Sequence, residues 1–192
     1  MLASSSPRRA LILTQLGVRF RVVTPVIDES LLPDETGASA ALRLAQAKAA
    51  TVAQRETQPV LAADTVVIAA GRVLGKPASE PEARAMLQLL AGRTHEVITG
   101  LSLLVAGRQY TGLDRTAVTF APMAAGEIAW YAATGEPFDK AGGYHVDGRG
   151  SLFITHISGS PSNVAGLPVR LFLELTRQAG LDLGLPAPEA IR

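Results

Sequence analysis

Cysteine is absent from this chain of 192 residues. Its absence excludes a disulfide framework, a thiol nucleophile and a zinc site built on thiolates. There is also little excess charge: the formal net charge is +1, so the chain lacks the broad basic face that binds nucleic acid through counterion release. It has no apolar run long enough to span a bilayer and no signal-peptide pattern at its start. We therefore expect a cytoplasmic protein with no stable partner among nucleic acids or membranes.

Several common catalytic signatures are missing as well. The chain has no glycine-rich Walker-type loop and no serine nucleophile elbow. Its three histidines, His95, His145 and His156, are far apart in sequence and lack metal-ligand spacing. We expect them to be ordinary strand or loop residues. Carboxylates and cations remain as the candidates for chemistry.

Helices and strands alternate along the sequence. A chain of this length fits one domain, and no internal repeat or domain-sized linker divides residues 1–192. The pattern predicts an α/β protein, a mixed twisted sheet with helices on its faces. Strands are expected at 19–23, 60–69, 73–74, 95–105, 110–120 and 152–154, and helices at 7–17, 39–55, 79–92, 127–133 and 169–179. Pro186 and Pro188 mark a frayed end.

The start of the first helix carries an unusual charge. Ser6 is a good N-cap and Pro7 suits the first helical position, and Arg8 and Arg9 follow in the first turn. The positive end of a helix dipole disfavours cations, so the arginines are badly placed in a merely structural helix. They are well placed if phosphate binds there, because free N–H groups and guanidinium forks converge on it. The alternative is a basic helix start whose arginines point into water.

Asp64 is the strongest single candidate for a functional residue. It is the only charge in the apolar strand 60–69, where a carboxylate is costly unless it is paired, hydrogen-bonded or bound to metal. The hydroxyl-bearing Thr65 follows it. Lys48 lies on the apolar stripe of the helix 39–55 and, if it points inward, requires an anion. The alternatives are an Asp64 satisfied by backbone N–H groups and a Lys48 that reaches out to water.

Further charges lie in loops and turns. Asp28 and Glu29 form a pair of loop carboxylates, and Lys76 lies in a tight Gly-Lys-Pro turn that could equally be plain surface. Lys140 lies in a glycine-rich turn, where backbone can approach a ligand closely. Together with the arginines, these groups suit triphosphate chemistry. In such chemistry cations neutralise phosphate oxygens, while carboxylates hold a divalent metal or orient a water.

Five motifs follow one another in a recognisable order. They are Ser-Ser-Ser-Pro-Arg-Arg (4–9), Ala-Asp-Thr-Val-Val (63–67), Gly-Lys-Pro (75–77), Asp-Lys-Ala-Gly-Gly-Tyr (139–144) and Asn-Val-Ala-Gly-Leu-Pro (163–168). Each is weak alone, whereas the ordered set resembles the Maf proteins, over residues 2 to about 173. Maf proteins are cytoplasmic nucleoside triphosphate pyrophosphatases that cleave between the α and β phosphates. The resemblance implies that reaction and a divalent metal cation, Mg²⁺ or Mn²⁺.

The resemblance also implies a fold and individual residue roles. The fold is an elongated, two-lobed α/β fold with a central cleft, similar to that of inosine triphosphate pyrophosphatases, and often forms a homodimer. Asp64 corresponds to the catalytic base, and Glu29 with Asp64 falls where the metal is held. The phosphate-binding cations correspond to Arg8, Arg9, Lys48 and Lys76. The predicted substrate-binding residues are completed by Ser6, Thr65, Lys140 and Asp147.

Two subgroups of this family differ in substrate. One prefers dTTP and UTP and has Asp-Lys-Ala-Gly followed by a glutamine just before a glycine; the other prefers 7-methyl-GTP and lacks that pattern. Residues 139–142 match the first subgroup, but Asp147 stands in place of the glutamine. A carboxylate accepts hydrogen bonds and cannot donate as an amide does, so recognition must differ there. The alternatives are a 7-methyl-GTP or broad-specificity pyrophosphatase, or a nucleotide-binding regulator of septum formation without turnover.

Overall fold

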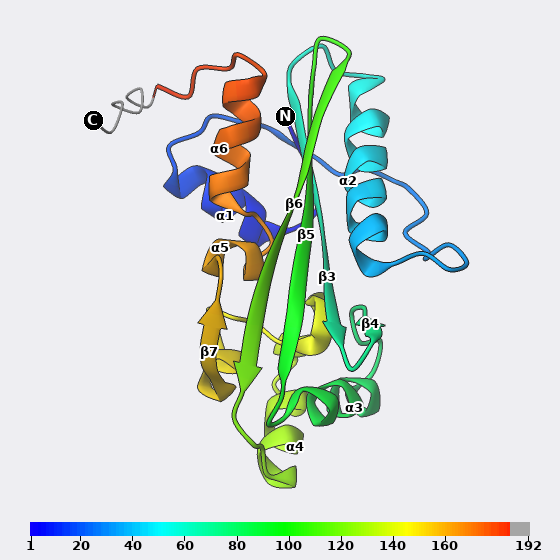
Figure 1. Cartoon of the computed structure of the whole chain (residues 1–192), viewed down its shortest axis with the longest axis vertical. Helices are drawn as coiled ribbons and strands as arrows, with labels where there is room; N and C mark the ends of the chain where they lie inside the picture. The colour runs from blue at the N-terminus through cyan, green and yellow to red at the C-terminus, as the bar shows by residue number, and fades with distance from the viewer. Residues whose placement is uncertain (185–192) are drawn as a thin grey trace.

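A mixed sheet of seven strands forms the centre of the structure, a computed structural model that describes residues 1–184 (Figure 1). The strand order is β2-β1-β3-β5-β6-β7, and β4 pairs with β3. Pairs within β3, β5, β6 and β7 are antiparallel, whereas β1 runs parallel to both β2 and β3. The strands are β1 (Leu2–Ala3), β2 (Val22–Val23), β3 (Val60–Ala69), β4 (Arg72–Leu74), β5 (Thr94–Val105), β6 (Arg108–Phe120) and β7 (Ile154–Ser158).

The helices gather around the two ends of the long β5–β6 hairpin. Helices α1, α2 and α6 surround one end, and α3 and α4 lie at the other (Figure 1). This arrangement confirms the predicted elongated α/β fold, while the central cleft stays a prediction. The helices are α1 (Pro7–Gln15), α2 (Gly37–Ala53), α3 (Glu80–Leu90), α4 (Ala125–Ala133), α5 (Pro161–Val164) and α6 (Val169–Gln178), with 3-10 turns η1 (Glu136–Asp139), η2 (Ala141–Gly143) and η3 (Arg149–Phe153).

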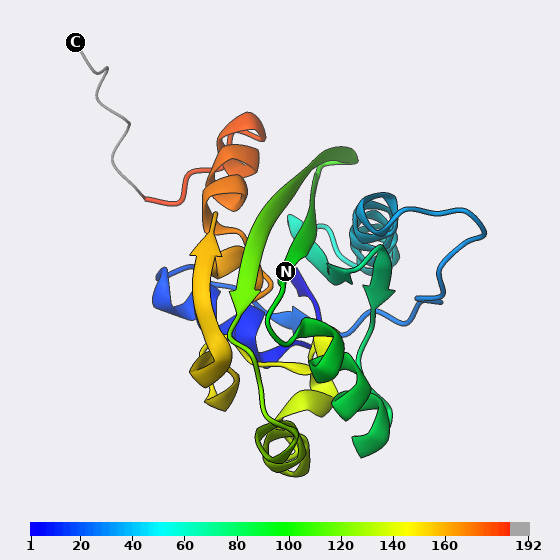
Figure 2. The same cartoon turned by 60° about the horizontal axis from the view of Figure 1, so that its bottom comes forward.

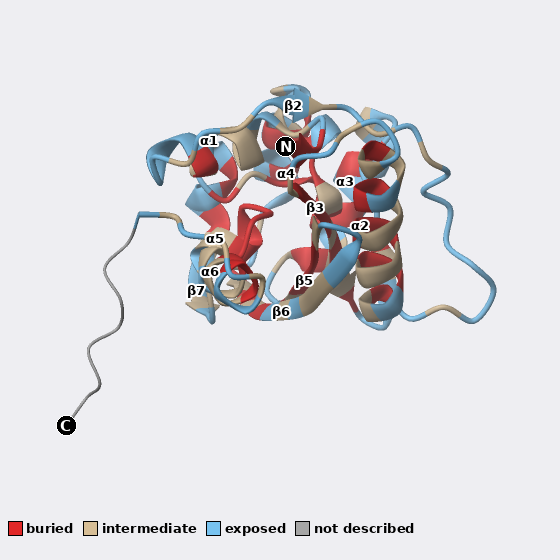
Figure 3. Cartoon of the chain, turned by 90° about the horizontal axis from the view of Figure 1, so that it is seen from above, coloured by how far each residue is buried: buried red, intermediate tan, exposed pale blue. Residues whose placement is uncertain are grey.

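Both faces of the sheet are covered by helices. Helix α2 packs on β3 and β5 from one side, and α5 and α6 pack on β5 and β6 from the other, where α1 also lies (Figures 2 and 3). Successive side chains of β3 alternate between these faces. Ala62 and Val66 pack with residues of α2, whereas Ala63 packs with Leu13 of α1 and Phe172 of α6. The alternation therefore turns an even-numbered side chain of β3 toward α2 and an odd-numbered one toward α1.

One edge of β3 is only partly paired. Strand β5 pairs with the opposite edge over residues 60–68. On this edge β1 pairs with residues 61–62 and β4 pairs with residues 67–69. Among the residues that the structure describes, no strand pairs with the stretch between them, residues 63–66, which we call the edge gap. Asp64 lies in the edge gap, so no strand bonds its main chain on that side of β3.

Two predicted strands need correction, and one helix was missed. The strand expected at 19–23 is limited to β2, because β1 offers only two residues as its pairing partner. The strand expected at 152–154 is a 3-10 turn up to Phe153, and β7 begins only at Ile154. Local hydrogen bonds hold that turn: the backbone N–H of Ser151 donates to Gly148. Helix α5 was not predicted at all.

The other predicted bounds agree with the structure to within a few residues, and β3 has the predicted bounds. Positive φ angles at Ala106 and Gly107 make the tight turn between β5 and β6. Pro186 and Pro188 lie outside the described residues. Over residues 1–184, none of the helices has both the length and the apolar character needed to cross a membrane.

Candidate active site

Asp64 and Lys48 form a buried ion pair between β3 and α2. The Lys48 Nζ lies 2.6 Å from Asp64 Oδ1, and both residues are buried. Lys48 belongs to the buried stripe of α2, as its helical spacing predicts. The helix approaches closely because Gly100 stands opposite Asp64 on β5: a Cβ at Gly100 would lie 2.4 Å from the carbonyl oxygen of Ala41. Of the alternatives that the sequence left open, the structure therefore has the inward Lys48 and the paired Asp64.

Glu29 joins this pair from the loop before α2. Its Oε1 lies 2.8 Å from Lys48 Nζ, so two carboxylates share one ammonium group. Arg43 of α2 holds the loop in place through a two-pronged ion pair with Glu35, at 2.6 and 2.7 Å, and a 3.0 Å hydrogen bond to the carbonyl of Ser30. The neighbouring Asp28 is exposed and accepts a hydrogen bond from the backbone of Ser30. Of the predicted carboxylate pair, the structure brings only Glu29 to the site.

Burial changes the proton affinity of Asp64. Desolvation raises its pKa above the ordinary value for an aspartate, and the charges of Lys48 and Arg9 oppose that rise. The carboxylate is therefore a stronger base than an exposed aspartate, while the adjacent ammonium stabilises its ionised form. Lys48 binds Oδ1, and among the described residues no side chain occupies Oδ2. This geometry suits a carboxylate that takes a proton from a bound water.

Arg9 connects the first helix with the opposite face of the sheet. Its Nε donates to the carbonyl of Gly166 at 2.8 Å, and its two terminal nitrogens donate to Thr65 Oγ1 at 3.0 Å and Ser4 Oγ at 3.3 Å. Thr65 is odd-numbered on β3 and so faces this side, away from Lys48. Arg9 thus binds together α1, β3 and the turn before α6. Three of its five N–H donors are already used by the protein.

Arg8 differs from its neighbour. It is half-buried, and it has no hydrogen bond or ion pair with any other residue in 1–184. Burial lowers its pKa, while the negative charges of Asp139 and Asp147 raise it. Ser6 begins α1 as predicted, but its side chain makes no capping bond to the helix. Arg8 and the first turn of α1 are therefore free to bind an anion, as the phosphate interpretation requires.

Lys76 and Lys140 lie on two turns that touch each other. The backbone N–H of Gly142 donates to the carbonyl of Gly75 at 2.9 Å. Gly142 has a φ of +73°, and a Cβ there would lie 2.9 Å from Val67 at the end of the edge gap. Lys76 is exposed, whereas Lys140 is buried and forms an ion pair with Asp139. The structure thus places both lysines at the β4 side of β3, without direct contact to Asp64.

Asp147 is exposed on the loop that follows η2, close enough to Arg8 for their charges to interact. The backbone around it is held by Glu136, a residue that sequence reasoning missed. The carboxylate of Glu136 accepts hydrogen bonds from the N–H groups of Arg149 and Gly150. Its only signal in the sequence is its place three residues before the motif at 139–144.

A second missed group is a chain of buried hydroxyl and amide side chains behind Arg9. Thr65 Oγ1 lies 2.9 Å from Thr99 Oγ1, which donates to the carbonyl of Asn163 at 3.2 Å. The Asn163 side chain is fully buried and donates to the carbonyl of Val97 and to Thr116. These bonds fix the motif at 163–168 against β5 and β6. A threonine opposite Thr65 could be found only once the β3–β5 register was known.

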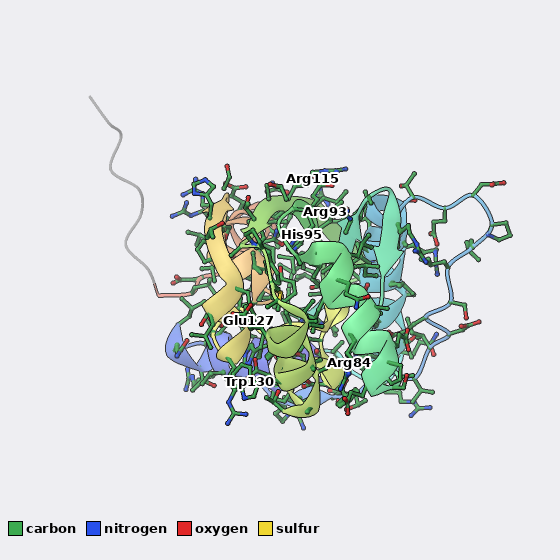
Figure 4. All side chains as sticks on the ribbon, turned by 90° about the horizontal axis from the view of Figure 1, so that it is seen from below. Arg84, Arg93, His95, Arg115, Glu127 and Trp130 are labelled. Carbon is green, nitrogen blue, oxygen red and sulfur yellow. The ribbon has the colours of Figure 1, made fainter. Side chains whose placement is uncertain are left out.

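The histidines take structural positions. His95 is buried, and its Nε2 lies 2.8 Å from the hydroxyl of Tyr144 (His95 is labelled in Figure 4). Its ring also packs edge-to-face against Phe120. Burial lowers the pKa of His95 to about 4, so its imidazole is neutral near pH 7. Within residues 1–184, no three His, Cys, Asp or Glu side chains gather into a group that could hold a metal ion.

A divalent cation could nevertheless use Glu29 and Asp64. Protein Mg²⁺ sites are commonly built from one or two carboxylates, with substrate phosphates and waters as the other ligands. Two carboxylates that already converge on one cation, the Lys48 ammonium, fit that pattern. The donor set is therefore suited to a metal that arrives with a phosphate ligand, rather than to a closed structural metal site.

Comparison with known proteins adds family and fold. A family model described as Maf-like protein matches residues 1–179. Curated relatives named dTTP/UTP pyrophosphatase include those of Anaeromyxobacter sp., 46% identical over 98% of this chain and 93% of the relative, and Myxococcus xanthus, 47% identical over 95% and 93%. The relative of Pasteurella multocida is 44% identical over 95% and 96%. The solved structure of a HAM1 protein from Coxiella burnetii has a similar fold, with a TM-score of 0.50 at 16% identity over 92% of this chain and 97% of that one.

Proposed function

The chain belongs to the Maf family, and on that premise we propose that it hydrolyses nucleoside triphosphates to monophosphates and pyrophosphate, with dTTP and UTP as substrates. Relatives that carry this printed name are 40–47% identical over nearly the whole chain, which supports the substrate class. The observation that carries the proposal is the buried Asp64 in the edge gap, held by Lys48. A binding protein without turnover has no need of a buried carboxylate there.

The proposed chemistry divides the work between the two sides of the edge gap. Asp64 Oδ2 takes a proton from a water that attacks the α-phosphorus, and the leaving group is pyrophosphate. Lys48 keeps Asp64 oriented through a hydrogen bond and contacts Glu29 as an ion pair, so its three-proton ammonium keeps a donor for a phosphate oxygen. Arg8 and the N–H groups at the start of α1 bind phosphate from one side. Lys76 and Lys140 supply positive charge to the phosphates from the other side of the edge gap.

We propose Mg²⁺ or Mn²⁺ as the cofactor, held by Glu29 and Asp64. The metal would supply positive charge to the phosphate oxygens when bound. Binding can be measured without turnover, by following the electron paramagnetic resonance signal of Mn²⁺ in the presence of a triphosphate that has a methylene group between its α and β phosphorus atoms. Glu29→Gln should weaken this binding. Equal Mn²⁺ affinity in wild type and Glu29→Gln would remove Glu29 from the site.

The reaction is tested by its products. The protein is mixed with Mg²⁺ and each of UTP, dTTP, CTP and 7-methyl-GTP, and the phosphorus products are followed by nuclear magnetic resonance. Pyrophosphate with nucleoside monophosphate is expected, fastest from UTP and dTTP. A UTP analogue with an imido bridge between the β and γ phosphorus atoms should still be cleaved. Orthophosphate with nucleoside diphosphate contradicts the proposed bond, and binding without any product favours the regulator.

We include 7-methyl-GTP among the tested substrates because Asp147 replaces the glutamine that is typical of the dTTP/UTP subgroup. We further propose that the enzyme acts in the cytoplasm and as a homodimer, as the family resemblance implies. Light scattering at micromolar concentration measures the mass, and the mass of a single 20.1 kDa chain would contradict the dimer.

A further inference from the structure

A carboxylate outside the phosphate-binding groups holds the loop that carries Asp147. Glu136, at the start of η1, accepts hydrogen bonds on both of its oxygens. Its Oε1 accepts from the Tyr131 hydroxyl at 2.7 Å and from the N–H of Gly150 at 3.0 Å, and its Oε2 accepts from the N–H of Arg149 at 3.1 Å. Hydrogen bonds to an ionised carboxylate are shorter and stronger than neutral ones. Although burial acts to raise the pKa of Glu136, these hydrogen bonds lower it, so the group is ionised near pH 7.

Tyr131 completes the arrangement at the other end of the same loop. Its ring is fully buried in α4, and its hydroxyl accepts a hydrogen bond from the N–H of His145 at 3.0 Å. Tyr131 and Glu136 therefore hold residues 145 to 150 at both ends through one continuous set of hydrogen bonds. We call these two side chains the loop brace.

The loop fits tightly against the loop brace. A Cβ at Gly148 would lie 2.7 Å from Glu136 Oε2, and a Cβ at Gly150 would lie 2.7 Å from the Tyr131 hydroxyl. The Cβ at Gly150 would also lie 2.7 Å from the backbone carbonyl oxygen of His145, so glycine is required there, whereas at Gly148 only side-chain atoms lie that close. The backbone on either side of Asp147 has no room to shift toward the brace.

We propose that Glu136 and Tyr131 are positioning residues for base recognition: by fixing the loop 145–150, they set where the Asp147 carboxylate meets the nucleotide. Among the described residues, neither side chain forms a hydrogen bond or ion pair with Lys48, Arg8 or Lys76, although Tyr131 lies close enough to Arg8 for an electrostatic interaction, so the bonds of the brace reach the site through the loop. The inference rests on the proposed function, since selectivity requires turnover, but the conformation of the loop can be tested without it.

The first test measures the loop itself. Glu136→Gln keeps the size of the side chain but loses the charge that strengthens the bonds to Arg149 and Gly150, and Tyr131→Phe keeps the buried ring but loses the hydroxyl. In both variants hydrogen exchange should speed up at the amides of residues 145–150. The matched control is Glu127→Gln on α4, a carboxylate whose hydrogen bond is accepted from the N–H of Ala124 and not from the loop (Glu127 is labelled in Figure 4). Unchanged exchange at these amides in both loop-brace variants would overturn the inference, whatever the activity.

The second test measures selectivity. The ratio of kcat/KM for UTP to that for CTP should fall by about 3- to 30-fold in Glu136→Gln, the usual range for residues that act through a neighbour. Asp147→Asn should change this ratio less in the Glu136→Gln background than in wild type, because both substitutions act on the same contact between Asp147 and the base. A ratio equal to that of wild type, in a variant that still cleaves UTP, overturns the role in selectivity. If wild type cleaves no triphosphate, the proposed function has failed and the exchange result alone decides the loop brace.

Discussion

Lys48 and Asp64 are joined across the boundary between α2 and β3 by a 2.6 Å ion pair whose two side chains are 8% and 11% exposed. A buried pair of this kind contributes little net stability, because desolvation of both charges offsets their attraction. Removal of one partner is costly, since it leaves the other charge buried. Here Glu29 also contacts Lys48, so the lysine keeps one anion when Asp64 is neutralised. This allows Asp64 to be changed without leaving the lysine unpaired.

Asp64→Asn should therefore abolish most of the turnover while the fold is kept. The amide preserves the shape but cannot accept the proton from water, and general base catalysis contributes about 10²–10⁴-fold in rate. kcat for UTP is measured by pyrophosphate release, with circular dichroism as the check on folding. Asp182→Asn, an exposed aspartate near the end of the described chain, serves as the control. A kcat close to wild type in Asp64→Asn would show that another group is the base.

The two adjacent arginines should respond differently to substitution. Arg8→Ala should raise KM more than Arg8→Lys, because the alanine loses the cation and the lysine loses only the planar fork. Arg9→Lys should mainly lower the free energy of unfolding, by about 1–3 kcal/mol, because three hydrogen bonds to the protein depend on its guanidinium. Urea unfolding and steady-state kinetics separate the two effects. Unchanged kinetics in both Arg8 variants would place Arg8 in solvent.

Base selectivity should depend on Asp147. Its carboxylate can accept a hydrogen bond from the N3–H of uracil or thymine, whereas cytosine has no hydrogen on N3. UTP and dTTP should therefore outrank CTP. Asp147→Gln keeps an acceptor oxygen but removes the charge and adds an amide donor, so it should change selectivity among bases more than the rate on the best substrate, by on the order of 1–3 kcal/mol per hydrogen bond gained or lost. Identical base profiles in wild type and variant would place this residue outside the recognition site.

Stability should decrease in mild acid because of His95. Its pKa is about 4 in the folded protein and about 6.5 in the unfolded chain, so the unfolded chain binds the proton more tightly. The neutral His95 therefore contributes about 3 kcal/mol to the free energy of unfolding. This contribution is fully present above pH 6.5 and is lost as the pH falls toward 4. Urea unfolding at pH 7.5 and 4.5 should show this loss, and His95→Gln should reduce it. His156→Gln, at an exposed position, is the control, and an equal pH dependence in wild type and His95→Gln would exclude this cause.

Gly100→Ala tests the close approach of α2 to the sheet. A Cβ there would lie 2.4 Å from the carbonyl oxygen of Ala41, so the helix must shift. We expect a loss of about 1–3 kcal/mol in unfolding free energy, typical of overpacking, and lower activity as Lys48 moves from Asp64. Gly126→Ala in α4 has open space around its Cβ and should be neutral or slightly stabilising. A destabilisation no greater than that of Gly126→Ala would contradict the tight packing.

The central strand and its charged residue could be predicted because their signals are local. An apolar run rich in β-branched residues predicts β3, and helical spacing places Lys48 on the apolar stripe of α2. The contacts of Arg9 could not be predicted, because Gly166 is 157 residues away along the chain. The turn η3 could not be predicted for the same reason, because the carboxylate of Glu136 that anchors its start accepts from Arg149 and Gly150, which are 13 and 14 residues away. Residue type predicts such partners only when they are neighbours in sequence.

The short length of the edge gap also protects the protein from other chains. An unpaired strand edge normally invites a strand from another molecule, which is a route to aggregation. Here the open stretch is four residues long and is closed at either end by β1 and β4. A strand from another molecule would therefore meet β1 or β4 before it could form a ladder. Four unpaired residues between two paired stretches leave too little main chain for a polypeptide strand to build a ladder.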